Sequence, residues 1–339
     1  MNTSGAYHFI PPSRSMKWLG VISSIGMYII NMVGFLDTQT GSALGCGPDW
    51  PLCNGEVIPN LNNIHVIIEF GHRMLVGGFA LLATGFMIWA LVRYRAFIEV
   101  KIFSLLGIGF IVVQSALGAL AVVFVNPPTV LALHLGFGLL AMVGVGLLTV
   151  FLFQLDAQMH GRPSGIGFRR ETSPSTKAWV WSTWIFTYLA IYWGSYVAFR
   201  GAGGACPTWP LCNGKVFPGF SGLVGLDFIH RLAAVALAVL TAALLWHLKQ
   251  YRRTRPDLYR GAFWLFIAVL AQIATGANLA LSHVATGPYL LHVATLMLLF
   301  ADVSYLVLQV VPSKTLEQAA SPAGSDVGWT PEQAHNPQT

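Results

Sequence analysis

Four histidines stand inside long apolar segments and recur at one spacing. His72 and His134 are 62 residues apart, and His230 and His292 are separated by the same interval. Ionisable groups are costly inside apolar segments of membrane-spanning length and usually serve a function there. Two imidazoles facing each other in the core of a helix bundle can ligate both axial positions of a planar metal macrocycle such as haem. We therefore interpret the pairs as two haem sites, rather than as histidines that hydrogen-bond to a neighbouring helix.

A carboxylate precedes the first histidine of each pair. Glu69 lies three residues before His72, and Asp227 lies three residues before His230, so each shares a helical face with its histidine. Glu69 could serve as a catalytic proton acceptor in redox chemistry on a bound substrate. The alternative is an ion pair with Arg73 or with another helix. Because the two sites are alike in these residues, the residues alone leave open which site reacts.

An arginine follows the same histidine in each pair. Arg73 and Arg231 are placed to contact haem propionates through charge-assisted hydrogen bonds. The alternative for an arginine at this depth is snorkelling to the membrane interface. Gln114 and Gln272 also recur, and they fit either helix–helix hydrogen bonding or a polar position in a pocket.

The four cysteines form two close pairs outside the apolar segments. Cys46 and Cys53 flank one short loop, and Cys206 and Cys212 flank another. In an oxidising compartment each pair is expected to form a structural disulfide. A redox-active pair that exchanges electrons with the site below is the sharper alternative. Zinc is disfavoured because two cysteines leave a tetrahedral site incomplete.

The composition places these residues in a membrane protein. Of 339 residues, 55% are hydrophobic and only 9% are charged, whereas soluble domains carry roughly 25% charged residues. The net charge of +6 is typical of Lys and Arg kept on the cytoplasmic side of a membrane, so we expect no nucleic-acid partner. Eight segments are long and apolar enough to span as helices: 18–36, 64–92, 102–125, 130–154, 178–199, 223–248, 261–281 and 287–311.

Charge gives these spans an orientation. Fifteen of the 19 Lys and Arg residues lie before the first span, in alternate connections or after the last span. The positive-inside rule makes that side cytoplasmic, so both termini are expected inside and the loops 37–63 and 200–222 outside. The tail 312–339 is polar and is expected to be disordered and cytoplasmic.

The chain is built from two copies of one unit. Trp50 to Gly55 read Trp-Pro-Leu-Cys-Asn-Gly, and the same six residues recur from Trp209 to Gly214. Each unit has four spans, so both insert with one orientation, and we predict two four-helix bundles related by a pseudo-twofold axis. The expected division is a cytoplasmic N-terminus, an N-terminal bundle, a cytoplasmic linker, a C-terminal bundle and the tail: 1–17, 18–154, 155–177, 178–311 and 312–339.

From about residue 17 to 311 the chain resembles the haem A synthase family, in particular the bacterial type with cysteine pairs in the outer loops. The matching stretches are Thr38 to Cys46, Asp49 to Cys53, Glu69 to Arg73, Ala132 to His134, Ile229 to Arg231, and Leu291-His292. A lone His-Arg pair would not be specific, but this combination is.

The resemblance implies an activity that spacing alone does not. The family oxidises the C8 methyl of haem O to a formyl group, through an alcohol and a gem-diol, and so supplies haem A to terminal oxidases. It implies substrate haem at His72 and His134 with Glu69 essential, and a haem b cofactor at His230 and His292. The implied setting is a bacterial-type plasma membrane, with lipid, a haem O synthase, terminal oxidase assembly factors and an electron donor or acceptor as partners.

Two other classes fit the same histidines. One is a dihaem b-type electron carrier whose haems are both permanent, and the other is a haem transfer or insertion partner for an oxidase. Glu69 and the cysteine pairs favour the enzyme, because a pure electron carrier needs neither.

Overall fold

The computed structural model describes residues 9–164 and 172–311, and over these ranges its long elements are all α-helices. The predicted tail 312–339, and parts of the predicted N-terminus 1–17 and linker 155–177, lie outside the described residues. The helices are α1 (Arg14–Gln39), α2 (Ile64–Tyr94), α3 (Ile98–Val123), α4 (Pro128–Met159), α6 (Pro174–Phe199), α7 (Gly222–Leu248), α8 (Pro256–Leu281) and α9 (Thr286–Val310). The predicted all-α membrane architecture is confirmed at this level.

Seven of these eight helices are long and apolar enough to cross a membrane. The remaining one is α6, which is 26 residues long but carries Trp179, Trp181, Trp184 and Trp193 together with several hydroxyl side chains. Its aromatic and hydroxyl residues lower its mean hydropathy. Trp184 is partly buried against α9, where its indole Nε1 donates to Ser304 Oγ at 2.8 Å.

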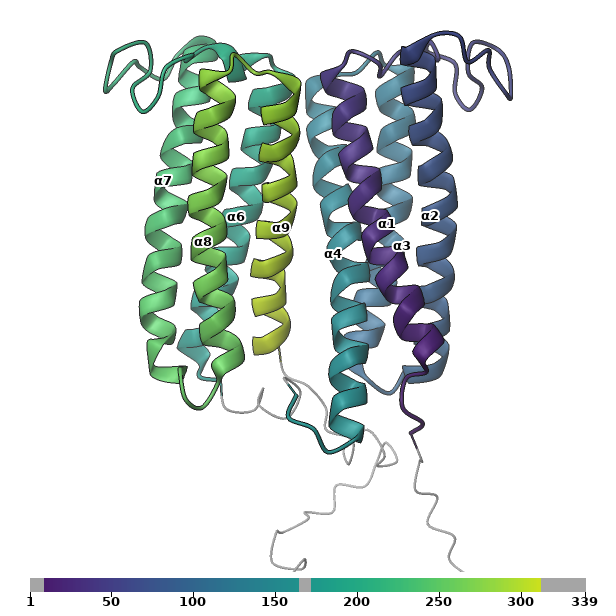
Figure 1. Cartoon of the computed structure of the whole chain (residues 1–339), viewed down its shortest axis with the longest axis vertical. Coiled ribbons are helices and arrows are strands. Elements are labelled where there is room, and N and C mark those ends of the chain that lie inside the picture. Colours follow the sequence, from purple (N-terminus) through teal and green to yellow (C-terminus); the bar gives the residue numbers. More distant parts are fainter. Residues whose placement is uncertain (1–8, 165–171, 312–339) are drawn as a thin grey trace, which may run out of the picture.

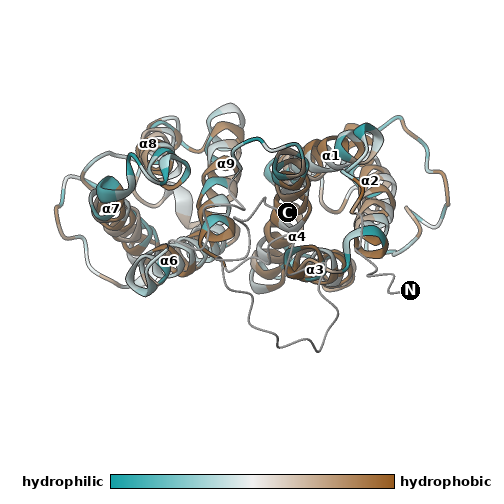
Figure 2. Ribbon diagram, turned by 90° about the horizontal axis from the view of Figure 1, so that it is seen from below, coloured by the Kyte–Doolittle hydropathy of each residue, from teal (hydrophilic) through white to brown (hydrophobic). Residues whose placement is uncertain are grey.

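The helices lie side by side in two sets of four, α1–α4 and α6–α9 (Figure 1). Within each set, neighbours in sequence pack together and the last helix closes back on the first, so α2 lies diagonally across from α4, and α7 across from α9 (Figure 2). The sets meet where α4 packs against α6 and α9, and α1 packs against α9. Both long loops leave the same end of the molecule.

The tightly packed core lies toward the end away from those loops. On α2 the fully buried side chains stop at Glu69 and resume at Ala83, and on α7 they stop at Asp227 and resume at Leu237. Close approach of α3 and α4 depends on glycines there, since a Cβ on Gly144 would lie 3.1 Å from Gly107 Cα. Small residues permit this contact between membrane helices, where lipid gives little hydrophobic drive for association.

Polar anchors hold the helix ends at that side. Ser13 caps α1 by accepting from Met16 N at 3.2 Å, and Pro174 and Pro256 begin α6 and α8 at positions where a missing backbone N–H is tolerated. Arg255 is fully buried and pairs with Asp257 at 2.7 Å, while it also donates to Gln309 O at 3.0 Å. This arginine therefore ties the start of α8 to the end of α9.

Candidate functional site

The four predicted histidines lie on diagonal helices of each set. His72 and His230 are eight residues into α2 and α7, and His134 and His292 are six residues into α4 and α9. At 1.5 Å per residue these positions are about 12 Å and 9 Å from the helix starts, at the loop end of the molecule. The two histidines of each set therefore lie on diagonally placed helices at similar depth.

Every one of the four imidazoles lies against a glycine of a neighbouring helix. A Cβ added to Gly34 would lie 3.1 Å from the His72 ring, and one on Gly118 would lie 2.9 Å from His134 Cε1. In the second set, the Cβ of an alanine at Gly194 would lie 2.6 Å from His230 Cε1, and one at Gly276 would lie 3.0 Å from His292 Cε1. The glycines leave room for each ring, and a larger residue would push it away.

The histidines of the first set both have an oxygen beside Nδ1. His134 Nδ1 lies 2.7 Å from the backbone carbonyl oxygen of Gln114, and His72 Nδ1 lies 3.6 Å from Asp37 Oδ2. A carbonyl can only accept, so His134 carries its proton on Nδ1 and presents an unprotonated Nε2, the form that ligates a metal.

The histidines of the second set are held differently. His230 Nδ1 is buried and has no hydrogen-bond partner among the residues that the structure describes. The His292 ring is contacted by side chains instead. Gln272 Nε2 lies 3.2 Å from Nδ1 and 3.1 Å from Nε2, so it would have to move aside for Nε2 to bind iron, and Thr275 Oγ1 lies 3.1 Å from Nδ1. Gln272 in turn accepts from Thr295 Oγ1 at 2.5 Å, so this corner is a small network of neutral polar groups.

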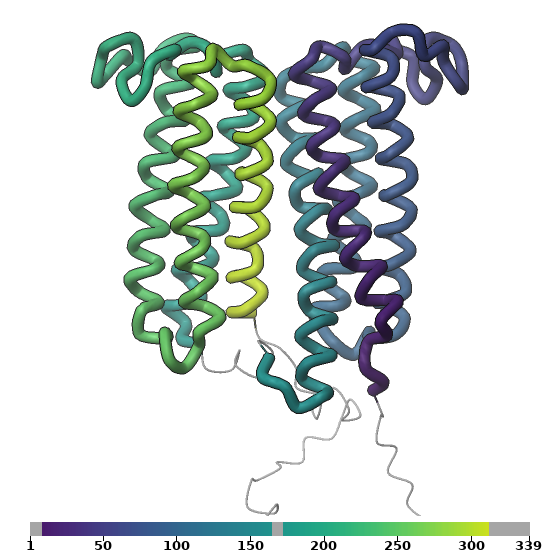
Figure 3. Tube along the Cα trace, viewed as in Figure 1, coloured from purple at the N-terminus to yellow at the C-terminus, as the bar shows by residue number. Residues whose placement is uncertain are grey.

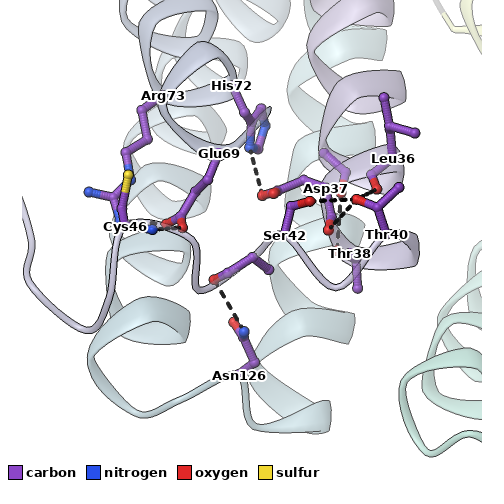
Figure 4. Close-up of polar contacts among 12 residues, drawn as sticks. Leu36, Asp37, Thr38, Thr40, Ser42, Cys46, Glu69, His72, Arg73 and Asn126 are labelled. Carbon is purple, nitrogen blue, oxygen red and sulfur yellow. Dashed lines mark hydrogen bonds and ion pairs between the residues drawn. The ribbon is translucent and has the colours of Figure 1, made fainter. Parts of the chain in front are cut away.

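Glu69 joins helix α2 to the cysteine loop of the first set (Figure 4). Glu69 is only 2% exposed. Its Oε1 accepts a hydrogen bond from Arg73 Nη2 at 2.5 Å, and its Oε2 accepts one from the backbone N–H of Cys46 at 2.7 Å. Arg73 also donates to the carbonyl oxygen of Leu52 at 2.9 Å. Both carboxylate oxygens are therefore occupied, and the ion pair with Arg73 that the sequence left as an alternative is present.

Asp227 and Arg231 repeat the ion pair in the second set with one difference. Asp227 Oδ2 lies 3.1 Å from Arg231 Nη2, and Arg231 donates to the carbonyls of Thr208 at 2.8 Å and Cys206 at 2.5 Å. The aspartate is one methylene shorter than Glu69, and in this set the arginine, rather than the carboxylate, bonds to the backbone of the first cysteine.

The structure joins Cys46 to Cys53 and Cys206 to Cys212 by disulfides. Each disulfide is followed directly by a tight turn in which the second cysteine exchanges backbone hydrogen bonds with Glu56 or Lys215. Both loops extend sideways past α2 and α7 at the same end of the molecule (Figure 3). The bonds of Glu69, Arg73 and Arg231 to the loop backbones connect these disulfide loops to the helices that carry His72 and His230.

These residues fit a haem in each set. The glycines give each imidazole room at its helix crossing, the two histidines of each set lie on diagonally placed helices at similar depth, and between Glu69 and Ala83 on α2 and between Asp227 and Leu237 on α7 no residue is buried. The buried Nδ1 of His230 without a partner also suits a ring whose orientation is completed by a ligand at Nε2.

Comparison with known proteins finds a family and named relatives that match most of this chain. Residues 17–303 match the COX15-CtaA family, described as cytochrome oxidase assembly protein. A protein of Halalkalibacterium halodurans named heme A synthase is 36% identical, covering 89% of this chain and 99% of its own length. Its counterparts in Symbiobacterium thermophilum and Bacillus cereus bear the same name and are each 34% identical, over 88% and 91% of this chain and 96% and 97% of their own lengths.

The chain belongs to the haem A synthase family. The family match covers both sets of helices and all four histidines. It confirms the resemblance drawn from the sequence motifs, and the structure has a disulfide-bonded cysteine pair in each long loop.

Several residues beside the four histidines are not predicted by the sequence. The apolar segment ends at residue 36, which places Asp37 in the loop 37–63, yet α1 continues to Gln39 and buries Asp37 beside His72. Thr275 and Thr295 are not predicted either, because isolated threonines in apolar helices give no signal. Gly34 and Gly194 could have been found, since they recur at the offset of 160 that relates Cys46 to Cys206.

Proposed function

We propose that the protein is a haem A synthase that oxidises the C8 methyl of haem O to a formyl group. Family membership supports the activity, and one structural observation supports its placement here: two matched histidine pairs, each ring held against a glycine on a neighbouring helix. Converting a methyl to an aldehyde removes four electrons and adds one oxygen atom, through an alcohol and a gem-diol that loses water.

The first set, α1–α4, is the proposed substrate site. His72 and His134 would ligate the iron of haem O from opposite corners, and His134 is already fixed with Nε2 free by its bond to Gln114 O. Glu69 is the carboxylate near this histidine pair, and we assign it the role of proton acceptor for the methyl oxidation. Its bonds to Arg73 and to Cys46 N hold it in place, and one of its oxygens must exchange a donor when it takes a proton.

The second set, α6–α9, is the proposed cofactor site. His230 and His292 would be the axial ligands of haem b, which when bound supplies one-electron redox chemistry. The neutral Gln272, Thr275 and Thr295 network orients the His292 ring. Arg73 and Arg231, held at the loop end by their carboxylates, are proposed to contact the haem propionates in their respective sets.

The membrane arrangement completes the proposal. All eight helices span, including α6, as two four-helix bundles related by a pseudo-twofold axis, and the divisions are 18–154 and 178–311 with the linker 155–177 between them. Basic residues face the cytoplasm with both termini, and the disulfide loops face outward, where oxidation is permitted. Haem O synthase, oxidase assembly factors and an electron donor or acceptor are the proposed partners.

Haem extraction tests this function directly. The full-length protein is co-expressed with a haem O-producing enzyme, purified, and its haems are identified by mass spectrometry. Haem A or its hydroxylated precursor together with haem b is expected. Haem b alone, with haem O left unconverted in the membranes, would favour the dihaem electron carrier instead.

A further inference from the structure

Asp37 is a buried carboxylate that the proposed reaction has not yet used. It lies in the last turn of α1, is 6% exposed, and places Oδ2 3.6 Å from His72 Nδ1 (Figure 4). Its Oδ1 is buried without a hydrogen-bond partner, and no Lys or Arg of the described ranges pairs with it, whereas Glu69 has Arg73. Burying a carboxylate without a cation is costly, which indicates that Asp37 accepts a hydrogen bond from a donor within the site itself.

The second set has no equivalent acid. Gly34 and Gly194 occupy matching places against His72 and His230, and Gly41 and Gly201 both end their helices with a φ of 68°. The same offset of 160 matches Asp37 with Val197, which is 3% exposed. Among the residues that the structure describes, His230 Nδ1 accordingly has no hydrogen-bond partner, while His72 Nδ1 faces a carboxylate.

We propose that Asp37 is a positioning residue of the substrate site, which accepts the Nδ1–H of His72 and so presents Nε2 to the iron of haem O. This rests on the proposed function. The present 3.6 Å separation must close by roughly 0.5 Å to reach hydrogen-bond distance. A carboxylate acceptor makes an imidazole a more basic ligand than a neutral acceptor does, so His72 becomes the strongest donor of the four.

The consequence is an electronic difference between two otherwise similar sites. A more basic axial ligand stabilises ferric iron, so the haem of the first set should have the lower reduction potential. Glu69 does not supply this effect, because its oxygens are bonded to Arg73 and to the Cys46 N–H. Asp37 therefore makes the proposed substrate site electronically different from the proposed cofactor site, although their histidines, glycines and arginines are repeated.

Three variants of the full-length, haem-loaded protein test the proposal. Asp37→Asn keeps the shape and removes the charge, Asp37→Val installs the residue found at the matching position, and Val197→Asp makes the reciprocal change. Redox titration followed optically and low-temperature electron paramagnetic resonance report on both haems. The haem signal that disappears in the Gly194→Ala variant is assigned to the haem of the second set.

Both Asp37 variants are expected to raise the potential of the first haem, alter its ferric spectrum and leave the second unchanged. Haem A formation should fall about 10–100-fold, the range typical for loss of a ligand's hydrogen-bond partner. Val197→Asp should lower the potential of the second haem. The haem b content of the same samples reports whether each variant folds. If Asp37→Val does not accumulate, the potentials and spectra of Asp37→Asn alone test the proposal.

Unchanged potentials and spectra in Asp37→Asn would overturn the proposal even where haem A formation falls. That result would leave the proposed function standing if the unaltered protein makes haem A. If the unaltered protein converts no haem O, the proposed function fails, but a potential shift of the first haem in Asp37→Asn would still establish the pairing of Asp37 with His72.

Discussion

Replacing Gly194 by alanine should selectively empty the second haem site. The added methyl would lie 2.6 Å from His230 Cε1, whereas carbon atoms in contact prefer about 3.5–4.0 Å, so the ring must move by roughly 1 Å. A metal ligand tolerates only a few tenths of an ångström. Overpacking of this kind costs about 1–3 kcal/mol, which corresponds to about 5–150-fold weaker haem binding.

The assay is haem stoichiometry and the optical spectrum of the purified variant. We expect the second haem to be lost, or to change to a spectrum without two histidine ligands, while the first set still binds substrate. Gly118→Ala should do the reverse, because its methyl would lie 2.9 Å from His134 Cε1.

Gly109→Ala on α3 is the matched control, since a Cβ there meets nothing within 4 Å. It should retain both haems and the unaltered spectrum. Full haem b occupancy with an unchanged two-histidine spectrum in Gly194→Ala would refute the assignment of His230 as an axial ligand held against α6.

Three further predictions follow from the same geometry. Glu69→Gln should keep haem b but lower haem A formation at least tenfold, measured on extracted haems, whereas Asp227→Asn should leave product nearly unchanged; equal losses would contradict a role particular to Glu69. Serine at both Cys206 and Cys212 should lower the free energy of unfolding by about 2 kcal/mol, seen as a lower Tm, and native protein should show no reactive thiols before reduction. A tag after residue 311 should be accessible only from the cytoplasm; outward exposure would reverse the topology.

Much of the helical framework was predictable because hydrocarbon imposes a minimum apolar length. The segment 64–92 became α2 at Ile64–Tyr94, and 130–154 became α4 at Pro128–Met159. The helices run longer than the apolar segments because caps and N-terminal prolines extend them into polar surroundings. Hydropathy is a weaker guide to α6, whose tryptophans are partly buried or exposed and whose buried positions include several hydroxyl side chains.

The histidine pairs were predictable because duplication repeats their spacing, but their surroundings were not. Which atom lies beside Nδ1 depends on the rotation and axial register of a neighbouring helix, and apolar periodicity does not specify these. Asp37 is an example: it lies one residue beyond the predicted segment 18–36, and yet it is buried beside His72.

The two sets divide into shared and distinct parts, and the division has chemical meaning. All four imidazoles lie against a glycine, and each set pairs an arginine with a carboxylate one turn away, so these features set the space and the charge at the loop end. The groups beside Nδ1 differ: His72 faces a carboxylate, whereas His230 has no hydrogen-bond partner within the described ranges 9–164 and 172–311. The proposed use of one haem as substrate and the other as cofactor requires the two sites to treat their haems differently. Asp37, matched by Val197, is one difference between the sets that lies directly beside a histidine.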